Sequence, residues 1–152
     1  MIKLSNLIPK SFKDKAIDDE KIDKAFKFFK SKLSLNEYSI KYTLGYDNKD
    51  NNEDDDGEIE YKRSVDTNEY LSFLIRLNDK LTTDRIVKAL VHELIHVKQL
   101  VDGKLDKEEN MWDGKPITSY KNYWHEPWEI EARIESDRLW IEFNKANRDN
   151  LL

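Results

Sequence analysis

Residues 82–103 constrain the fold more than any other part of the chain, because they combine a helical pattern with two histidines. The segment opens with Thr-Thr-Asp, which is typical of a helix N-terminus, and Gly103 is a natural helix end. Its apolar side chains recur at three- and four-residue steps and gather on one side of the expected helix: Val87, Leu90, Val91, Leu94, Val97 and Val101. We therefore expect a helix from about 82 to 101 whose apolar side lies in the core.

The two histidines, His92 and His96, fall on nearly the opposite side of this helix, beside Gln99. Residues four apart lie one helical turn above each other, so two imidazoles can reach one metal ion. With Glu93 they form the zinc-binding pattern H-E-x-x-H, in which the Glu points aside from the metal and can act as a general base. Chance alone would produce this pattern in about 0.5% of chains of this composition. The alternative, two core histidines bonded to backbone carbonyls, is disfavoured because both avoid the apolar side.

Composition limits which other residues could complete such a site. The 152-residue chain contains no cysteine, which excludes a disulfide framework, a cysteine-based zinc finger, an iron–sulfur cluster and a thiol nucleophile. Further ligands of a tightly held metal must therefore be His, Asp or Glu. The 26 basic and 31 acidic residues leave a formal charge of −5, which disfavours nucleic-acid binding through a basic surface. The length suits one domain covering residues 1–152.

The first 15 residues have the composition of neither a signal peptide nor a membrane anchor. Their apolar side chains are scattered among Lys and Ser, with no continuous apolar run and no small-residue cleavage site. Elsewhere the longest apolar stretches are far shorter than the ~20 residues of a membrane helix. The default expectation is a soluble, cytoplasmic protein in a reducing compartment, which the lack of cysteine fits.

The rest of the chain predicts an α+β domain with a small antiparallel or mixed sheet. Apolar residues at helical spacing indicate helices, and strict alternation indicates strands. The expected elements are a helix at 18–33, strands near 38–46, 59–65 and 70–77, the helix at 82–101, an irregular segment at 104–124 and a last helix from Pro127 to about Lys145.

A catalytic zinc site needs three protein ligands and one open position, so a third ligand must be found. The metzincin pattern requires Gly at 99 and His at 102, but this chain has Gln99 and Asp102. Without the glycine the helix does not turn to bring Asp102 back toward the histidines. The start of the last helix offers four better candidates: His125, Glu126, Glu129 and Glu131. Ala132 follows Glu129 one turn later, and a small residue there would let the two helices approach closely.

The H-E-x-x-H segment together with E-I-E-A at 129–132 resembles the gluzincin metallopeptidases. That family carries H-E-x-x-H on one helix and a Glu in an E-x-x-A pattern on a later helix. The chain is most similar to the short single-domain members of phage and bacterial genomes, the minigluzincins, which often show a segment like Pro-Trp-Glu-Ile-Glu-Ala. The close match covers about ten residues, and the second motif is informative only in combination with the first. The resemblance implies a zincin-like fold and zinc-dependent peptidase activity.

Carried over position by position, the resemblance implies that His92 and His96 bind zinc, that Glu93 is the catalytic base and that Glu129 is the third ligand. Glu126, His125 and Glu131 remain alternatives to Glu129. Glu131 faces about 200° away from Glu129 around a helix, so only one of these two can bind the metal.

One position departs from the family pattern. Many gluzincins have an Asp directly after E-x-x-A, where this chain has Arg133. The carboxylate that would orient a histidine ligand therefore cannot be placed by that rule.

Peptide hydrolysis also needs a hydrogen-bond donor for the oxyanion and a surface for the substrate. Tyr120, Tyr123 and His125 precede the last helix, and in several zincins a Tyr or His from this region is the donor. The resemblance further implies that the strand at 70–77 is an edge strand that binds the substrate as an added strand. The alternative is that it is an ordinary core strand.

The function expected from these residues is a zinc metallopeptidase that acts on a peptide or protein substrate. Neither nucleic acid nor a membrane is expected as a partner. One alternative is a latent or non-catalytic zinc-binding module, in which the chain's own termini fill the cleft; the helix at 18–33 is long enough to cover one. Another is a metal-free interaction protein with an accidental motif.

Overall fold

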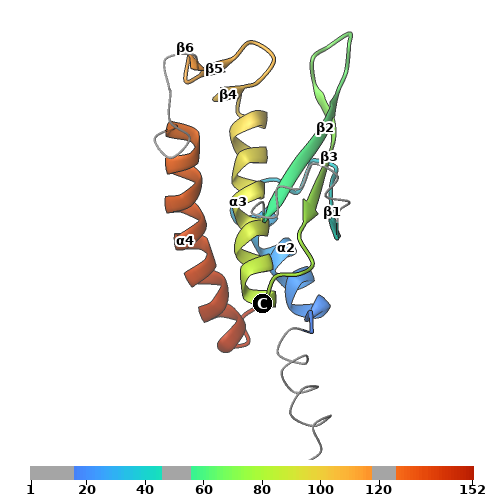
Figure 1. Cartoon of the computed structure of the whole chain (residues 1–152), viewed down its shortest axis with the longest axis vertical. Helices are drawn as coiled ribbons and strands as arrows, with labels where there is room; N and C mark the ends of the chain where they lie inside the picture. The colour runs from blue at the N-terminus through green and yellow to red at the C-terminus, as the bar shows by residue number, and fades with distance from the viewer. Residues whose placement is uncertain (1–15, 46–55, 118–125) are drawn as a thin grey trace, which may run out of the picture.

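The computed structural model describes residues 16–45, 56–117 and 126–152, and labels follow Figure 1. In these ranges the helices are α2 (Asp19–Lys32), α3 (Thr83–Val101) and α4 (Pro127–Arg148). The longer strands are β1 (Ile40–Leu44), β2 (Gly57–Arg63) and β3 (Tyr70–Leu77). Three two-residue strands follow α3: β4 (Leu105–Asp106), β5 (Met111–Trp112) and β6 (Lys115–Pro116). The described chain is therefore α+β, as the sequence predicts.

Local sequence signals explain where the helices begin. The Asp18 carboxylate accepts a hydrogen bond from the backbone N–H of Lys21 at the start of α2, and the Thr82 hydroxyl accepts one from Arg85 at the start of α3. Pro127 occupies the first turn of α4, where its missing N–H has no consequence. In the described ranges, no helix has the length and apolar character required to cross a bilayer.

The main sheet is mixed, with strand order β1-β3-β2. β1 runs parallel to β3, whereas β2 runs antiparallel to it. The expectation that 70–77 is an edge strand is therefore wrong, because β3 is paired on both sides. The sequences suit this order: β3 buries Phe73, Ile75 and Leu77, while the charged residues of β2 suit a strand with a free edge.

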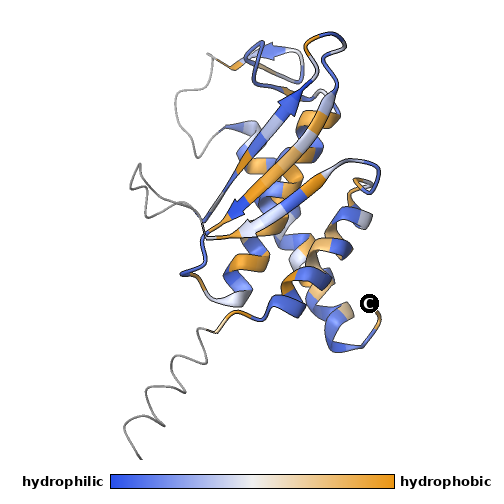
Figure 2. Ribbon diagram, turned by 90° about the vertical axis from the view of Figure 1, so that its right-hand side faces the viewer, coloured by the Kyte–Doolittle hydropathy of each residue, from blue (hydrophilic) through white to orange (hydrophobic). Residues whose placement is uncertain are grey.

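The helix α3 lies at the centre of the molecule, between the sheet and α4 (Figure 1). α4 runs antiparallel to α3, so the start of α4 lies beside the C-terminal half of α3 (Figure 1). α2 packs against both helices, and its Phe29 ring lies 5.5 Å from that of Phe143 on α4. Figure 2 shows the apolar residues concentrated in the central strand and in the helices behind the sheet. In this layering α3 is packed against the sheet on one side and against α4 on the other.

The layering buries α3 on more sides than the helical pattern predicts. Five of the six apolar residues expected in the core are fully buried and Val101 is half-buried. On the other side of the helix, His96 and Gln99 are also buried, at 7% and 2% exposure. The two-faced helix expected from the sequence is thus covered on its histidine side as well, because α4 packs there.

The segment after α3 is more regular than expected. In place of an irregular chain it forms a small antiparallel sheet with order β4-β5-β6. Strands of two residues are too short to leave an alternating pattern, so the sequence does not predict them. The expected irregular residues 118–124 lie outside the described residues.

Candidate metal centre

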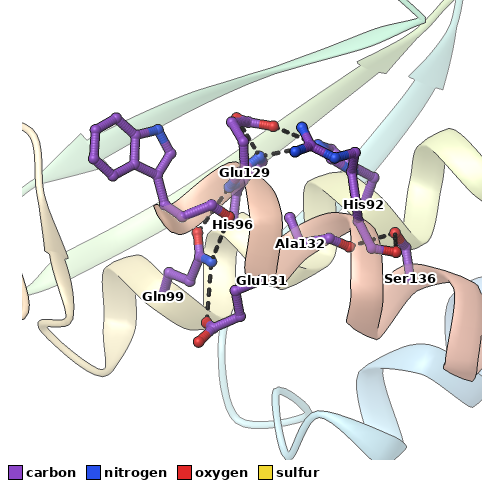
Figure 3. A network of polar contacts seen from close by, with 9 residues as sticks. His92, His96, Gln99, Glu129, Glu131, Ala132 and Ser136 are labelled. Atoms are coloured by element: carbon purple, nitrogen blue, oxygen red, sulfur yellow. Dashed lines mark hydrogen bonds and ion pairs between the residues drawn. The ribbon is translucent and has the colours of Figure 1, made fainter. Parts of the chain in front are cut away.

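Two histidines of α3 and one glutamate of α4 converge on one point (Figure 3). The Nε2 atoms of His92 and His96 lie 3.1 Å apart. Glu129 faces both of them, with Oε2 3.1 Å from His92 Nε2 and Oε1 3.0 Å from His96 Nε2. The three potential ligand atoms all lie within 4.8 Å of one another. In the part of the chain that the structure describes, no other group of three or more His, Asp or Glu side chains is placed to hold a metal ion.

The helices explain how Glu129 meets His92 and His96, which lie 37 and 33 positions earlier in the chain. The four-residue spacing of His92 and His96 places their rings edge-to-face, with centroids 4.8 Å apart. Glu129 lies in the first turn of α4, and Ala132, one turn later, is fully buried on the face of α4 that packs against α3. A small residue at this position allows the two helices to approach, as the sequence predicts.

Burial and charge make this cluster suited to a cation. Glu129 is 6% exposed, and an isolated buried carboxylate is costly. Burial, the largest influence, raises its pKa, but the hydrogen bonds and charges of the two imidazoles outweigh burial and hold the pKa well below its usual range. For His96, burial is again the largest single influence and lowers the pKa. Glu129 and Glu93 together outweigh it and raise the pKa above 6.5. The buried Glu129 carboxylate therefore needs a positively charged neighbour. Either a protonated imidazole or a divalent metal ion can be that neighbour.

Glu93 is half-buried and lines the same cavity as the three clustered side chains. Burial raises the pKa of its carboxyl group, while the neighbouring His96 and His92 act in the opposite direction. The backbone of β2 approaches it closely: a Cβ atom at Gly57 would lie 3.3 Å from Glu93 Cγ and 3.2 Å from the carbonyl oxygen of Arg76. Gly57 therefore provides the space in which the Glu93 side chain lies.

The site opens into a cavity of about 400 Å³. Its walls come from the start of β2, the middle of α3, the segment after α3 and the first turn of α4: Gly57, Glu58, Ile59, His92, Glu93, His96, Leu105, Lys107, Trp128 and Glu129. β2, an edge strand of the sheet formed by the described residues, thus borders the cluster. The expectation that the helix at 18–33 could cover the cleft is not supported, because no residue of α2 lines this cavity and its apolar side is in the core.

Gln99 is a residue of this site whose role was not foreseen. Its side-chain oxygen lies 2.8 Å from His96 Nδ1, and its amide nitrogen donates to Trp128 O at 3.0 Å and to Glu131 Oε1 at 3.1 Å (Figure 3). The other oxygen of Glu131 accepts a hydrogen bond from Lys104 Nζ. The available signal was the position of Gln99, three residues after His96 on the same side of the helix.

The other candidate ligands are located elsewhere or lie outside the description. Asp102 caps the end of α3 and pairs with Lys98 at 3.4 Å. Glu126 occupies the N-cap position of α4 and is not part of the cluster, and Glu131 is engaged by Gln99. The candidate ligand His125 and the candidate oxyanion donors Tyr120, Tyr123 and His125 lie outside the described residues.

No family model, no curated protein and no solved structure matches the chain significantly. Its chemistry must therefore be inferred from its own residues. Within the described part of the chain these amount to three clustered side chains that could hold a metal ion, a carboxylate beside them and an open cavity.

Proposed function

We propose that this protein is a zinc-dependent metallopeptidase of the gluzincin type, with a zincin-like fold. The observation that carries the proposal is the convergence of His92, His96 and Glu129, which come from two helices, at a cavity that also contains Glu93. A structural metal site is usually closed by four protein ligands, whereas three ligands facing a cavity leave a position for water and substrate.

The residues fit zinc. Two imidazole nitrogens and one carboxylate oxygen form a donor set used by catalytic zinc sites, and the chain offers no cysteine ligand. His92, His96 and Glu129 would hold the ion. When bound, Zn²⁺ polarises a substrate carbonyl and lowers the pKa of a water molecule.

Glu93 is the proposed general base. Its carboxylate accepts a proton from the attacking water and passes that proton to the amine that leaves when the peptide bond breaks. The raised pKa suits this exchange, because a carboxylate of very low pKa is too weak a base to take the proton from the water. The position of Glu93 in the cavity wall, one residue after His92, places it beside the metal ligands without making it one of them.

The substrate of this proposal is a peptide or protein segment in an extended conformation. Among the described residues β2 is an edge strand of the main sheet, and its first residues line the cavity, so an extended peptide can pair with the backbone groups on its outer side. This assigns to β2 the substrate-binding role that the sequence had suggested for residues 70–77. Tyr120 and Tyr123 remain the proposed oxyanion donors.

The test is a comparison of Glu93→Gln with Glu129→Ala and the unaltered protein. Zinc content is measured by elemental analysis, and cleavage is measured on a mixed peptide library by mass spectrometry. We expect Glu93→Gln to keep zinc at the level of the unaltered protein and to lose cleavage by about 100-fold or more, because the base is removed and the ligands are kept. We expect Glu129→Ala to lose both.

Two outcomes would contradict the proposal. Cleavage by Glu93→Gln at the rate of the unaltered protein would exclude Glu93 as the base. Failure of the unaltered protein to bind zinc near one equivalent would favour the metal-free alternative.

A further inference from the structure

Gln99 lies behind His96, on the side away from Glu129, and uses all of its hydrogen-bonding groups there (Figure 3). It is 2% exposed, so water does not substitute for these contacts. We propose that Gln99 is a positioning residue that fixes the tautomer of His96 and sets its distance from Glu129. This inference rests on the proposal that His96 binds a metal ion.

The orientation of the Gln99 amide follows from its surroundings. Its nitrogen faces two acceptors, the carbonyl oxygen of Trp128 and the carboxylate of Glu131. If the amide were flipped, its oxygen would face both acceptors, and a buried amide would lose two hydrogen bonds. The amide oxygen must therefore point toward His96.

This orientation decides which nitrogen of His96 carries the proton. The Gln99 oxygen can only accept, so Nδ1 of His96 must be the donor across the 2.8 Å contact. In the neutral ring Nε2 is then unprotonated, and Nε2 is the atom that faces His92 and Glu129. Gln99 thus prepares the nitrogen that a metal ion needs.

The same amide ties two helices together around the third ligand. Trp128 and Glu131 lie on either side of Glu129 in the first turns of α4, and both accept from Gln99 on α3. Glu131 is itself held by Lys104, whose Nζ lies 4.9 Å from the ring centroid of Trp112. Any displacement of α4 along α3 would break these contacts, so they fix the separation of His96 and Glu129.

The experiment measures zinc affinity by competition with a chromophoric chelator in four forms of the full chain. Gln99→Met keeps nearly the volume of the side chain and removes its hydrogen bonds. Glu131→Ala, at a half-buried position, removes the support of Gln99 without opening the core. Ser136→Ala is the matched control, since it removes a buried polar group of α4 that bonds only to carbonyls of its own helix, at Ala132 and Arg133.

We expect Gln99→Met to weaken zinc binding about 10–100-fold, the usual effect of losing a partner that orients a ligand. Glu131→Ala should weaken it by a smaller factor, because Trp128 still holds the amide, and Ser136→Ala should leave it unchanged. In ¹⁵N spectra of the imidazoles at high pH, His96 should be protonated at Nδ1 in the unaltered metal-free protein and should lose this single tautomer in Gln99→Met.

Three outcomes would overturn the inference: unaltered zinc affinity in Gln99→Met, an equal loss in Ser136→Ala, or a proton on Nε2 of His96 in the unaltered protein. An unaltered protein that binds no zinc would instead remove the proposed function, and this inference with it. Zinc binding with no effect of Gln99→Met would remove the inference alone.

Discussion

His96 is the residue at which a proton and the proposed metal ion would compete. In the metal-free protein its pKa is raised above 6.5, because Glu129 and Glu93 outweigh the effect of burial. A metal ion needs the unprotonated ring, so each bound ion must displace the proton held there. The affinity of the site therefore depends on pH in a range set by this residue.

We expect zinc affinity to fall as the pH is lowered, and to begin falling above pH 6.5, by up to about tenfold per pH unit for the one proton displaced. Titrations at several pH values with a buffered metal concentration measure the slope. A zinc affinity that does not change between pH 6 and 8, the range around the ordinary His pKa of ~6.5, would contradict this assignment.

The stability of the metal-free protein should change with pH in the opposite direction to the zinc affinity. A group whose pKa is raised on folding stabilises the fold below its unfolded pKa and loses this contribution as the pH rises through the folded value. Glu129, with a lowered pKa, contributes above its unfolded value and loses the contribution only on strong acidification. Metal-free unfolding temperatures should therefore decline as the pH rises above the ordinary His pKa of ~6.5, whereas metal-loaded ones should not.

At the scale of elements, the close packing of β2 on α3 determines where Glu93 lies. A methyl group at position 57 would lie 3.2 Å from Leu77 Cδ2 and 3.3 Å from Glu93 Cγ, closer than nearly all real Cβ contacts. Either the strand or the Glu93 side chain must shift to make room. The position of the strand and that of the Glu93 side chain are thus coupled.

We expect Gly57→Ala to lower peptide cleavage about tenfold while zinc affinity changes less than about twofold, since small displacements of a catalytic group are costly and the ligands are not touched. Lys62→Ala, at an exposed position of the same strand, is the control. Chelator competition and peptide cleavage measure the two quantities. Parallel loss of zinc and cleavage would mean that the added methyl group disturbs the whole site.

The sequence predicts helices better than strand order in this protein. The bounds of α2 and α3 follow from caps and periodicity, which act within a few residues, although α4 ends at Arg148 instead of about Lys145. The neighbours of β3 depend on segments far away in the chain, so its central position could not be derived locally. The same holds for Gln99, whose partners Trp128 and Glu131 are known only once α4 is docked.

At the scale of the whole molecule, the described fold begins with a packed helix and not with a covering segment. The N–H of Asp18 bonds to the Thr83 hydroxyl at 3.0 Å, and the apolar side of α2 is buried against α3 and α4. The alternative of a latent enzyme therefore concerns residues outside this core. Removal of residues 1–15 leaves every described residue in place and tests it directly.

We expect the chain lacking residues 1–15 to keep its zinc affinity, and its unfolding temperature to stay within about 4 °C of that of the full chain, because the buried contacts of α2 are kept. We expect its peptide cleavage to equal or exceed that of the full chain. Calorimetry measures the unfolding temperature, and the peptide library measures cleavage. If both chains bind zinc and neither cleaves any peptide, the protein is a non-catalytic zinc-binding module.

The antiparallel docking of α4 on α3 has a consequence for synthesis. Both histidines leave the ribosome before Glu129, and the third ligand is in place only after α4 has folded onto α3. A nascent polypeptide that ends before α4 therefore carries two of the three proposed metal ligands. Docking of the last helix on α3 is thus the event that completes the proposed site.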